Sequence, residues 1–289
     1  MSQMKANGIQ LEYQTFGDAN NPTMVLIRGL GTQLVDWHPD LVEQLSQLGL
    51  HIVIFDNRDV GLSEKFAAAG VPGFSEVLQG KVPAPYTLSD MAEDVLGLLD
   101  TLGIHKAHIL GISLGGMIAQ VLAGQHPERL LSLLSVMSSS GRPELPGPTD
   151  AAMAAFNAPP ATTKEEAIRQ TAEHKVVFGS PGYPESLEDR LASSRQSYER
   201  CHNPEGVARQ RLAVASFPDR SELLKTITVP TTVIHGVADA LIPLACGEDT
   251  AALIPDATFV PVPGMGHNIP GLLVPEFVAL VKAHMDRLP

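Results

Sequence analysis

Apolar residues along this chain follow two alternating spacings. Mostly apolar runs occupy residues 24–27, 52–55, 107–110, 130–137 and 231–234, and such runs predict strands that are buried on both faces. Between these runs, at residues 41–48, 91–102, 114–125 and 274–287, apolar residues recur every three or four positions, which predicts amphipathic helices. Alternating buried strands and helices require right-handed crossovers. The pattern therefore predicts an α/β fold with a mostly parallel central sheet and helices on both faces.

The two ends of the chain complete this sheet. Ile9, Leu11 and Tyr13 alternate with polar residues after an Asn7-Gly8 turn signal, which predicts two opening strands. Residues 258–262 form the last apolar strand. Together these segments predict about eight strands.

The strand-helix alternation is interrupted between residues 142 and 224. Prolines and glycines cluster at residues 143–148, and the remainder of this interval has the pattern of short helices and loops. Alternation resumes at Thr231. The chain is therefore predicted to form one core domain from residues 1–141 and 225–289, with residues 142–224 as a helical insertion after the sixth strand.

The composition restricts the class of partner. The formal net charge is −12, with 32 acidic and 20 basic residues, which argues against binding to nucleic acid or to an anionic membrane. Residues 1–7 are polar, and no signal-peptide pattern or run of about 18 apolar residues is present. Cys201 and Cys246 fit neither a disulfide framework nor a metal site. We expect free thiols, a cytoplasmic location and no bound metal.

A glycine-rich turn around Ser113 is the first candidate for chemistry. Gly111-Ile112-Ser113-Leu114-Gly115 lies between a predicted strand and a predicted helix, which is the context of a nucleophile elbow. Such a turn exposes the serine hydroxyl at the carboxyl end of the strand. It also points the Leu114 backbone N–H, at the start of the helix, toward developing negative charge. Ser113 is therefore the predicted nucleophile.

A serine hydroxyl needs a base, and ten histidines are candidates. His267 follows the last strand in the glycine-containing loop Pro263-Gly264-Met265-Gly266, where its side chain can reach the sheet edge. His235 ends an apolar strand and is predicted to be packed in the core. Other histidines in predicted helices or connections are expected to be surface or capping residues: His38, His105, His126 and His284. His267 is the predicted base.

The base must be held in one tautomer by an acid. Asp239 lies just after the strand that ends at His235, whereas residues 138–142 after the preceding strand contain no carboxylate. Asp219 lies where the insertion ends, and Asp256 lies beyond the following helix. The chain order Ser113, Asp239, His267 is that of the α/β hydrolases. Asp239 is therefore the predicted acid.

On these motifs the chain resembles the α/β-hydrolase family along its length outside the insertion, and it is similar to bacterial carboxylesterases, including anthracycline methyl esterases. The resemblance implies that the insertion is a helical cap, or lid, over Ser113. It also assigns the second oxyanion donor to the backbone N–H of Leu30, in Arg28-Gly29-Leu30. Arg28 stands where the family usually has histidine, and it is expected either to pair with a buried carboxylate or to contact substrate. Arg58, in Phe55-Asp56-Asn57-Arg58-Asp59, is expected to brace a loop.

The resemblance and the three candidate residues together predict a carboxylesterase that forms an acyl-enzyme on a small-molecule ester and needs no cofactor. A lactonase or a cofactor-free perhydrolase or haloperoxidase would use the same residues, and a ligand receptor with an idle triad is the alternative from another class. The apolar residues 151–161 favour neutral esters, whereas Arg28 favours an acidic one. Further candidates for the pocket wall are Gln33, Trp37, Met153, Phe156, Pro159 and Pro160. The pattern indicates neither the oligomeric state nor the natural substrate.

Overall fold

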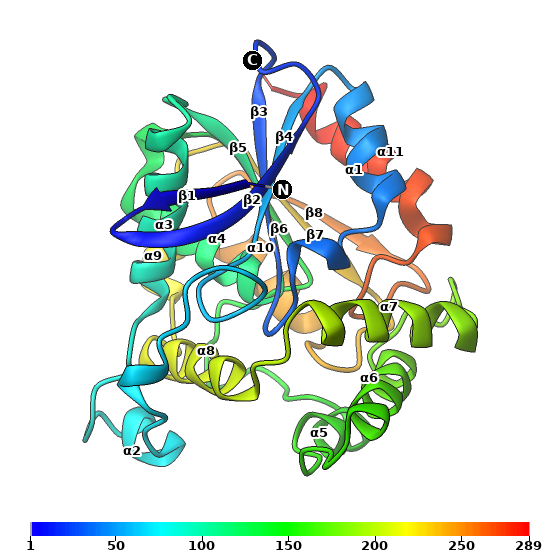
Figure 1. The fold of residues 1–289 in the computed structure, drawn as a ribbon. Coiled ribbons are helices and arrows are strands. Elements are labelled where there is room, and N and C mark those ends of the chain that lie inside the picture. Colours follow the sequence, from blue (N-terminus) through cyan, green and yellow to red (C-terminus); the bar gives the residue numbers. More distant parts are fainter. Residues whose placement is uncertain (1, 289) are drawn as a thin grey trace.

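An eight-stranded sheet forms the centre of the molecule in a computed structural model that describes residues 2–288 (Figure 1). The strands lie in the order β1-β2-β4-β3-β5-β6-β7-β8. β2 is antiparallel to β1 and β4, and the other pairs are parallel. The strands are β1 (Ser2–Ala6), β2 (Ile9–Phe16), β3 (Thr23–Ile27), β4 (His51–Phe55), β5 (Ala107–Ile112), β6 (Leu130–Val136), β7 (Thr231–Gly236) and β8 (Thr258–Val262). The predicted α/β fold with a mostly parallel sheet is confirmed.

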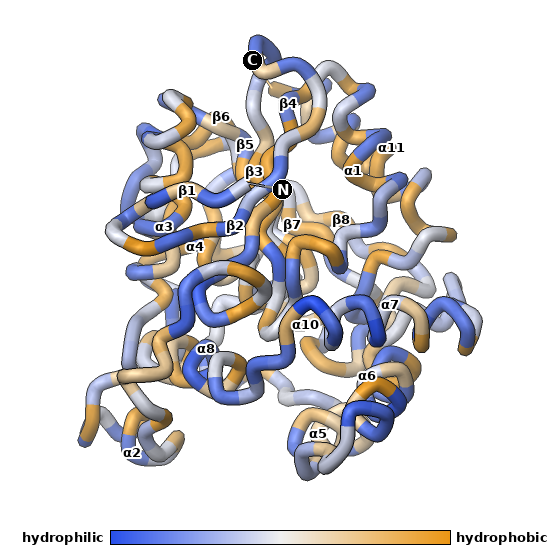
Figure 2. The backbone as a smooth tube through the Cα atoms, in the orientation of Figure 1, coloured by the Kyte–Doolittle hydropathy of each residue, from blue (hydrophilic) through white to orange (hydrophobic). Residues whose placement is uncertain are grey.

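Helices cover both faces of this sheet (Figure 1). One hydrophobic cluster joins one face of the central strands to α3 and α4, and a second joins the other face to α1 and α11. In Figure 2 hydrophobic residues predominate in the central strands, as expected for strands covered on both sides. The helices outside the insertion are α1 (Pro39–Gln47), α2 (Phe74–Leu78), α3 (Leu88–Thr101), α4 (Leu114–Gln125), α10 (Leu244–Leu253) and α11 (Val274–Met285).

Five helices lie between β6 and β7 in the sequence. They are α5 (Asp150–Phe156), α6 (Lys164–Val177), α7 (Leu187–Arg200), α8 (Pro204–Ser216) and α9 (Ser221–Leu224). In Figure 1, α5 to α8 lie together below the sheet, whereas α9 packs beside α4. Within residues 2–288, no helix has both the length and the hydrophobicity that a membrane crossing requires.

A hydrogen-bonded series of buried polar side chains lies near the amino-terminal ends of β5, β6 and β7. His108 Nδ1 lies 2.8 Å from Ser132 Oγ, which lies 2.7 Å from His284 Nε2. His284 Nδ1 in turn lies 2.7 Å from Thr232 Oγ1. The expectation that His284 is a surface or capping residue is wrong, because the residue is 2% exposed and both nitrogens of its ring are hydrogen-bonded. His38 does cap α1 by accepting a hydrogen bond from Asp40 N.

We expect the two buried histidines of this hydrogen-bonded series to make the protein acid-sensitive. Burial lowers the pKa of both His108 and His284 to about 4, and the charge of Arg287 adds to the effect at His284. Unfolded histidine titrates near 6.5, so below that pH the unfolded state binds protons that the folded state refuses. Stability is fully present above pH about 6.5 and falls toward pH about 4, by up to about 1.4 kcal/mol per pH unit for each histidine. Urea unfolding between pH 7 and pH 4 measures this slope.

The control for this measurement is the exposed His105. His284→Gln should reduce the pH dependence of the free energy of unfolding, whereas His105→Gln should leave it unchanged. Equal slopes in the wild type and in His284→Gln would contradict the assignment.

Candidate active site

The turn between β5 and α4 holds Ser113 in a strained backbone conformation. Its φ is 55° and its ψ is −120°, a region that L-residues other than glycine rarely occupy. Ser113 N donates to Val136 O of the neighbouring strand at 2.9 Å, and Ser138 Oγ donates to Ser113 O at 2.9 Å. These bonds hold the turn from both sides. The geometry is that of a nucleophile elbow, which presents the hydroxyl above the sheet edge.

Two glycines make this turn possible because the backbone approaches itself closely. A Cβ on Gly111 would lie 2.1 Å from Gly115 O, and a Cβ on Gly115 would lie 2.1 Å from Ile27 O. Both distances are far below van der Waals contact, so a side chain at either position would displace the backbone. The close packing of this turn therefore requires both glycines of the motif around Ser113.

His267 lies beside Ser113. Its Nε2 is 3.0 Å from Ser113 Oγ. The loop that carries it is held by the insertion: His267 N donates to Phe178 O at 2.7 Å, and Gly266 N donates to Ser180 Oγ at 2.9 Å. The ring therefore depends on residues almost ninety positions earlier, which sequence reasoning did not identify.

Asp239 completes the row. Its Oδ2 accepts from His267 Nδ1 at 2.7 Å, while its Oδ1 accepts from the backbone N–H groups of Leu241 and Ile242, both at 2.9 Å. The Asp239 side chain is fully buried, so these bonds fix its carboxylate in one orientation. His235 is buried nearby, as predicted, with Nε2 2.8 Å from Ile242 O, and burial lowers its pKa. The three residues predicted from the sequence are thus brought together in the order Ser113, His267, Asp239.

The backbone N–H groups of Leu30 and Leu114 are the predicted oxyanion donors. A Cβ on Gly29 would lie 3.2 Å from Ser113 Cβ, so the loop after β3 lies directly against the serine. Neither Leu30 N nor Leu114 N donates to a backbone acceptor within residues 2–288. Leu114 N is the first N–H of α4, where the helix leaves its donors unsatisfied. Both amides therefore lack a backbone acceptor among the described residues, a condition that the donors of an oxyanion hole must meet.

A cavity of about 480 Å³ opens onto Ser113 and His267. This volume is within the range of small-molecule sites. Its apolar wall comes from the core and from the insertion: Leu30, Ile112, Met137, Phe156, Phe178, Val207 and Leu241. Of the side chains suggested for the wall, Phe156 contributes, whereas Met153, Pro159 and Pro160 do not. Gln33 instead donates to Ser197 O at 2.7 Å and Cys201 O at 2.9 Å.

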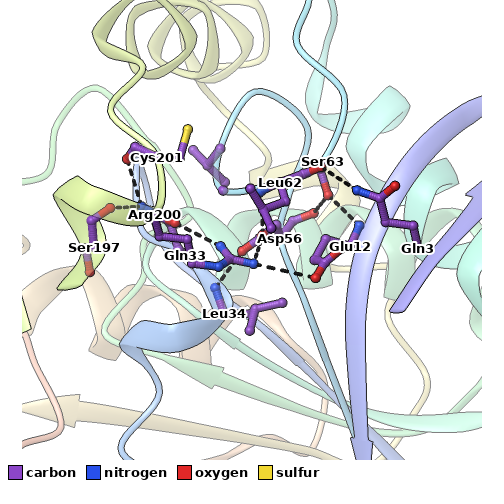
Figure 3. A network of polar contacts seen from close by, with 12 residues as sticks. Gln3, Glu12, Gln33, Leu34, Asp56, Leu62, Ser63, Ser197, Arg200 and Cys201 are labelled. Carbon is purple, nitrogen blue, oxygen red and sulfur yellow. Dashed lines mark hydrogen bonds and ion pairs between the residues drawn. The ribbon is translucent and has the colours of Figure 1, made fainter. Parts of the chain in front are cut away.

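The four residues after β4 tie the core to the insertion, beginning with Asp56. Its carboxylate accepts from Leu34 N at 2.7 Å and Leu62 N at 2.8 Å. Arg200, the last residue of α7, points into the same site, with Nη2 2.7 Å from Asp56 Oδ2 and Nη1 2.8 Å from Gln33 Oε1 (Figure 3). The end of α7 is therefore held to the core by a buried ion pair.

Asn57 and Arg58 bind elements of the core. Asn57 Nδ2 donates to Arg28 O at 3.1 Å, which positions the strand end that leads to Leu30. Arg58 binds Asp94 of α3 through two hydrogen bonds of 2.7 Å, and its guanidinium lies over the rings of Phe66 and Tyr86. These contacts agree with the expectation that Arg58 braces a loop.

Asp59 forms the second tie to the insertion. Arg209 of α8 donates to both of its oxygens, at 2.8 and 2.9 Å, and neither side chain is exposed. Burial alone would raise the pKa of Asp59, but hydrogen bonds from Arg209, Phe66 N and Tyr86 hold the pKa below its usual range. The carboxylate is therefore charged and fully paired in the folded protein.

Replacing Arg209 with methionine is expected to lower the free energy of unfolding by about 3–5 kcal/mol, because Asp59 would remain as a buried charge without its partner. Urea denaturation followed by circular dichroism measures the change. The matched control is Arg195→Met, whose ion pair with Glu165 is exposed and should contribute no more than about 1 kcal/mol. Asp59→Asn with Arg209→Met should recover part of the loss. Equal effects of Arg209→Met and Arg195→Met would contradict this account.

Within residues 2–288, no three histidine, cysteine, aspartate or glutamate side chains come together as a potential metal-binding group. Cys201 and Cys246 are both free, and Cys246 is buried.

Comparison with known proteins identifies the family. The sequence model of the alpha/beta hydrolase fold matches residues 22–271. The chain therefore belongs to the α/β-hydrolase family, as the sequence motifs predicted, and its distant relatives include hydrolases of several kinds.

Relatives cover nearly the whole chain at low identity. A rhodomycin D methylesterase of Streptomyces sp. strain C5 is 26% identical, covering 96% of this chain and 95% of its own. A putative carbamate hydrolase of Variovorax paradoxus is 28% identical over 90% of each chain. Among solved structures, an enol-lactonase of Burkholderia xenovorans has a TM-score of 0.75 at 25% identity, covering 99% of this chain and 100% of its own. Esterase RhEst1 of Rhodococcus sp. ECU1013 has a TM-score of 0.75 at 22% identity, covers both chains completely, and supports the fold.

Proposed function

We propose that the protein is a serine hydrolase that cleaves carboxylic esters through an acyl-enzyme on Ser113. The observation that carries the proposal is the continuous hydrogen-bonded row from Ser113 Oγ through His267 to Asp239, which opens onto the cavity. Two relatives of the chain are rhodomycin D methylesterases, which supports this class of reaction. The enol-lactonase structure makes lactone opening by the same residues the second candidate.

The proposed reaction has two halves. His267 Nε2 takes the Ser113 proton as Oγ attacks the ester carbonyl, and the carbonyl oxygen becomes an oxyanion held by the backbone N–H groups of Leu30 and Leu114. Collapse expels the alcohol, which receives the proton from His267. Water then repeats the sequence on the acyl-enzyme and releases the acid. Asp239 keeps the Nδ1 proton on His267 and stabilises the imidazolium, so no step requires a metal or cofactor.

We further propose that residues 142–224 form a cap that closes this site. The cavity wall combines core residues with residues of α5, α6 and α8, among them Phe156 and Val207. His267 is hydrogen-bonded to Phe178 of the same segment. Such a cap limits the access of water and restricts the shape of the substrate.

The test is a substrate panel combined with active-site labelling. Purified protein should release p-nitrophenolate from p-nitrophenyl butyrate, and it is compared on a δ-lactone and an aryl carbamate. A fluorophosphonate should abolish this activity, and peptide mass spectrometry should find one adduct, on Ser113. An adduct on another residue, or turnover that survives complete labelling of Ser113, would overturn the proposal.

A further inference from the structure

The cavity above Ser113 is cationic in a protein that is acidic as a whole. Three of its lining residues carry a positive charge, Arg28, Lys175 and Arg211, and none of its lining residues is aspartate or glutamate. The chain has 32 acidic and only 20 basic residues, so this arrangement runs against the overall composition. A cleft that is lined by charges of one sign and has low-dielectric walls favours a ligand of the opposite sign.

Arg28 is the cation nearest to the oxyanion loop, because it directly precedes Gly29 and Leu30. Its guanidinium lies 4.6 Å above the centre of the buried Trp37 ring, and its Nε donates to Thr32 Oγ1 at 3.2 Å. Within residues 2–288, its two terminal nitrogens form no hydrogen bond or ion pair, and Asp36 acts on it only as a more distant charge, so the expected pairing with a buried carboxylate is absent. Stacking and one hydrogen bond therefore hold the guanidinium with its paired donors uncommitted.

Lys175 reaches the same cavity from α6. Its Nζ donates to Ser193 Oγ at 2.7 Å, and no carboxylate of the described residues lies within ion-pair distance. Burial lowers the pKa of Lys175, the charges of Asp36 and Glu185 oppose that shift, and the charge of Arg28 adds to it. Burial likewise lowers the pKa of Arg28. Two desolvated cations that repel each other would both gain from an anion placed between them.

We propose that the preferred substrate is an ester or lactone that carries a free carboxylate, which binds to the guanidinium of Arg28 and the ammonium of Lys175. This inference rests on the proposed function, since it assigns the substrate class of the same site. A carboxylate matches the two parallel donors of a guanidinium, and the ammonium adds a point charge from the other side. Arg211, which stacks 4.4 Å from Phe156, adds a third positive charge to the wall.

The apolar residues 151–161 had favoured a neutral substrate. That segment does line the cavity, through Ala155, Phe156 and Ala158, and it offers no charge. The cations come instead from β3's end, from α6 and from α8, which approach one another only in the folded chain. The cavity therefore suits an apolar body with one anionic end.

The experiment compares matched substrates. In one pair the carboxylate is on the acyl side: mono-p-nitrophenyl adipate against p-nitrophenyl heptanoate. In the other it is on the leaving group: 4-acetoxybenzoate against its methyl ester. We expect kcat/KM to favour the acid in at least one pair. Arg28→Met and Lys175→Met should each reduce that acid-to-neutral ratio by about 10- to 100-fold, as expected for a hydrogen bond between charged groups. Arg28→Lys should retain part of the preference.

Arg169→Met is the matched control, since Arg169 is an exposed cation on the same helix as Lys175 and its loss changes the net charge equally. Its ratio should equal that of the wild type. A wild-type preference for the neutral member of both pairs, or a ratio unaffected by Arg28→Met and Lys175→Met, would overturn the proposal while ester hydrolysis itself stands.

A binding measurement separates this proposal from the proposed function. Monoethyl adipate is titrated calorimetrically into Ser113→Ala, which cannot form an acyl-enzyme. Binding that weakens about 10-fold or more when Arg28→Met is added supports the carboxylate subsite even if no ester is turned over. Binding that is equal in both proteins, or absent in both, rejects the subsite.

Discussion

Replacing Ser113 with alanine is expected to lower kcat for p-nitrophenyl butyrate by about 10⁵- to 10⁶-fold. The hydroxyl is the atom that bonds to the substrate, and the oxyanion donors alone supply only a small residual rate. His267→Ala should lower kcat by about as much. It removes the nitrogen that lies 3.0 Å from Ser113 Oγ, and without a group that accepts its proton the hydroxyl is a weak nucleophile. The double variant should be no slower than either single variant, since the two residues act as one unit. Steady-state kinetics at neutral pH measures all three.

The control for this prediction is Ser46→Ala on α1, whose hydroxyl donates only to Glu43 O at the surface. It should keep wild-type kcat. Circular dichroism should show that Ser113→Ala remains folded, because both bonds that hold the turn involve the backbone of residue 113, which the substitution leaves in place. If Ser113→Ala retained more than a few per cent of the wild-type kcat, another nucleophile would have to be sought.

Asp239→Asn is expected to lower kcat by about 10⁴-fold. The substituted amide can donate to His267 Nδ1, which forces the ring proton onto Nε2, the atom that must accept from Ser113. The two backbone N–H groups that hold Oδ1 can hold the asparagine oxygen equally, so the side chain should stay in place. The loss would therefore reflect the tautomer rather than displacement. The measurement is kcat for p-nitrophenyl butyrate, with thermal unfolding as the check on the fold.

Two other carboxylates provide the comparison. Asp219→Asn and Asp256→Asn alter exposed residues outside the row and should have wild-type kcat. A fully active Asp239→Asn beside an inactive Asp219→Asn or Asp256→Asn would show that the acid had been assigned to the wrong residue.

The centre of the sheet could be predicted from the sequence because its strands are buried on both faces. Residues 52–55 were predicted as a strand and lie in β4, whose five residues are all buried. The capping box of Thr87 and Asp90 at the start of α3 likewise depends only on residues three apart. The candidate site was predictable for the same reason. Ser113, Asp239 and His267 each lie at the end of a strand, and the ends of parallel strands share one edge.

Contacts between distant segments had no such signal. His284 has the spacing of an ordinary helical residue, and only the sheet places Ser132 beside it. Arg209 and Arg200 lie on polar helices, where arginine is most often solvated, and nothing local shows that each meets a buried aspartate. Lys175 reaches the cavity because α6 and β3's end converge in space. Charge pairing across the fold has no period along the chain, so a periodic pattern does not predict it.

The loop from Asp56 to Asp59 has a consequence for how the chain folds as it is synthesised. Arg209, the partner of Asp59, comes 150 residues later in the sequence. Arg200, the partner of Asp56, is almost as distant. Until α7 and α8 have been made, both carboxylates face an interior position without a counter-charge, which disfavours their burial. The loop that supports the Arg28–Leu30 strand end should thus acquire its final conformation after the inserted helices dock. We expect a ribosome-bound chain ending near residue 141 to remain open to proteases at this loop, although most strands of its sheet are already present.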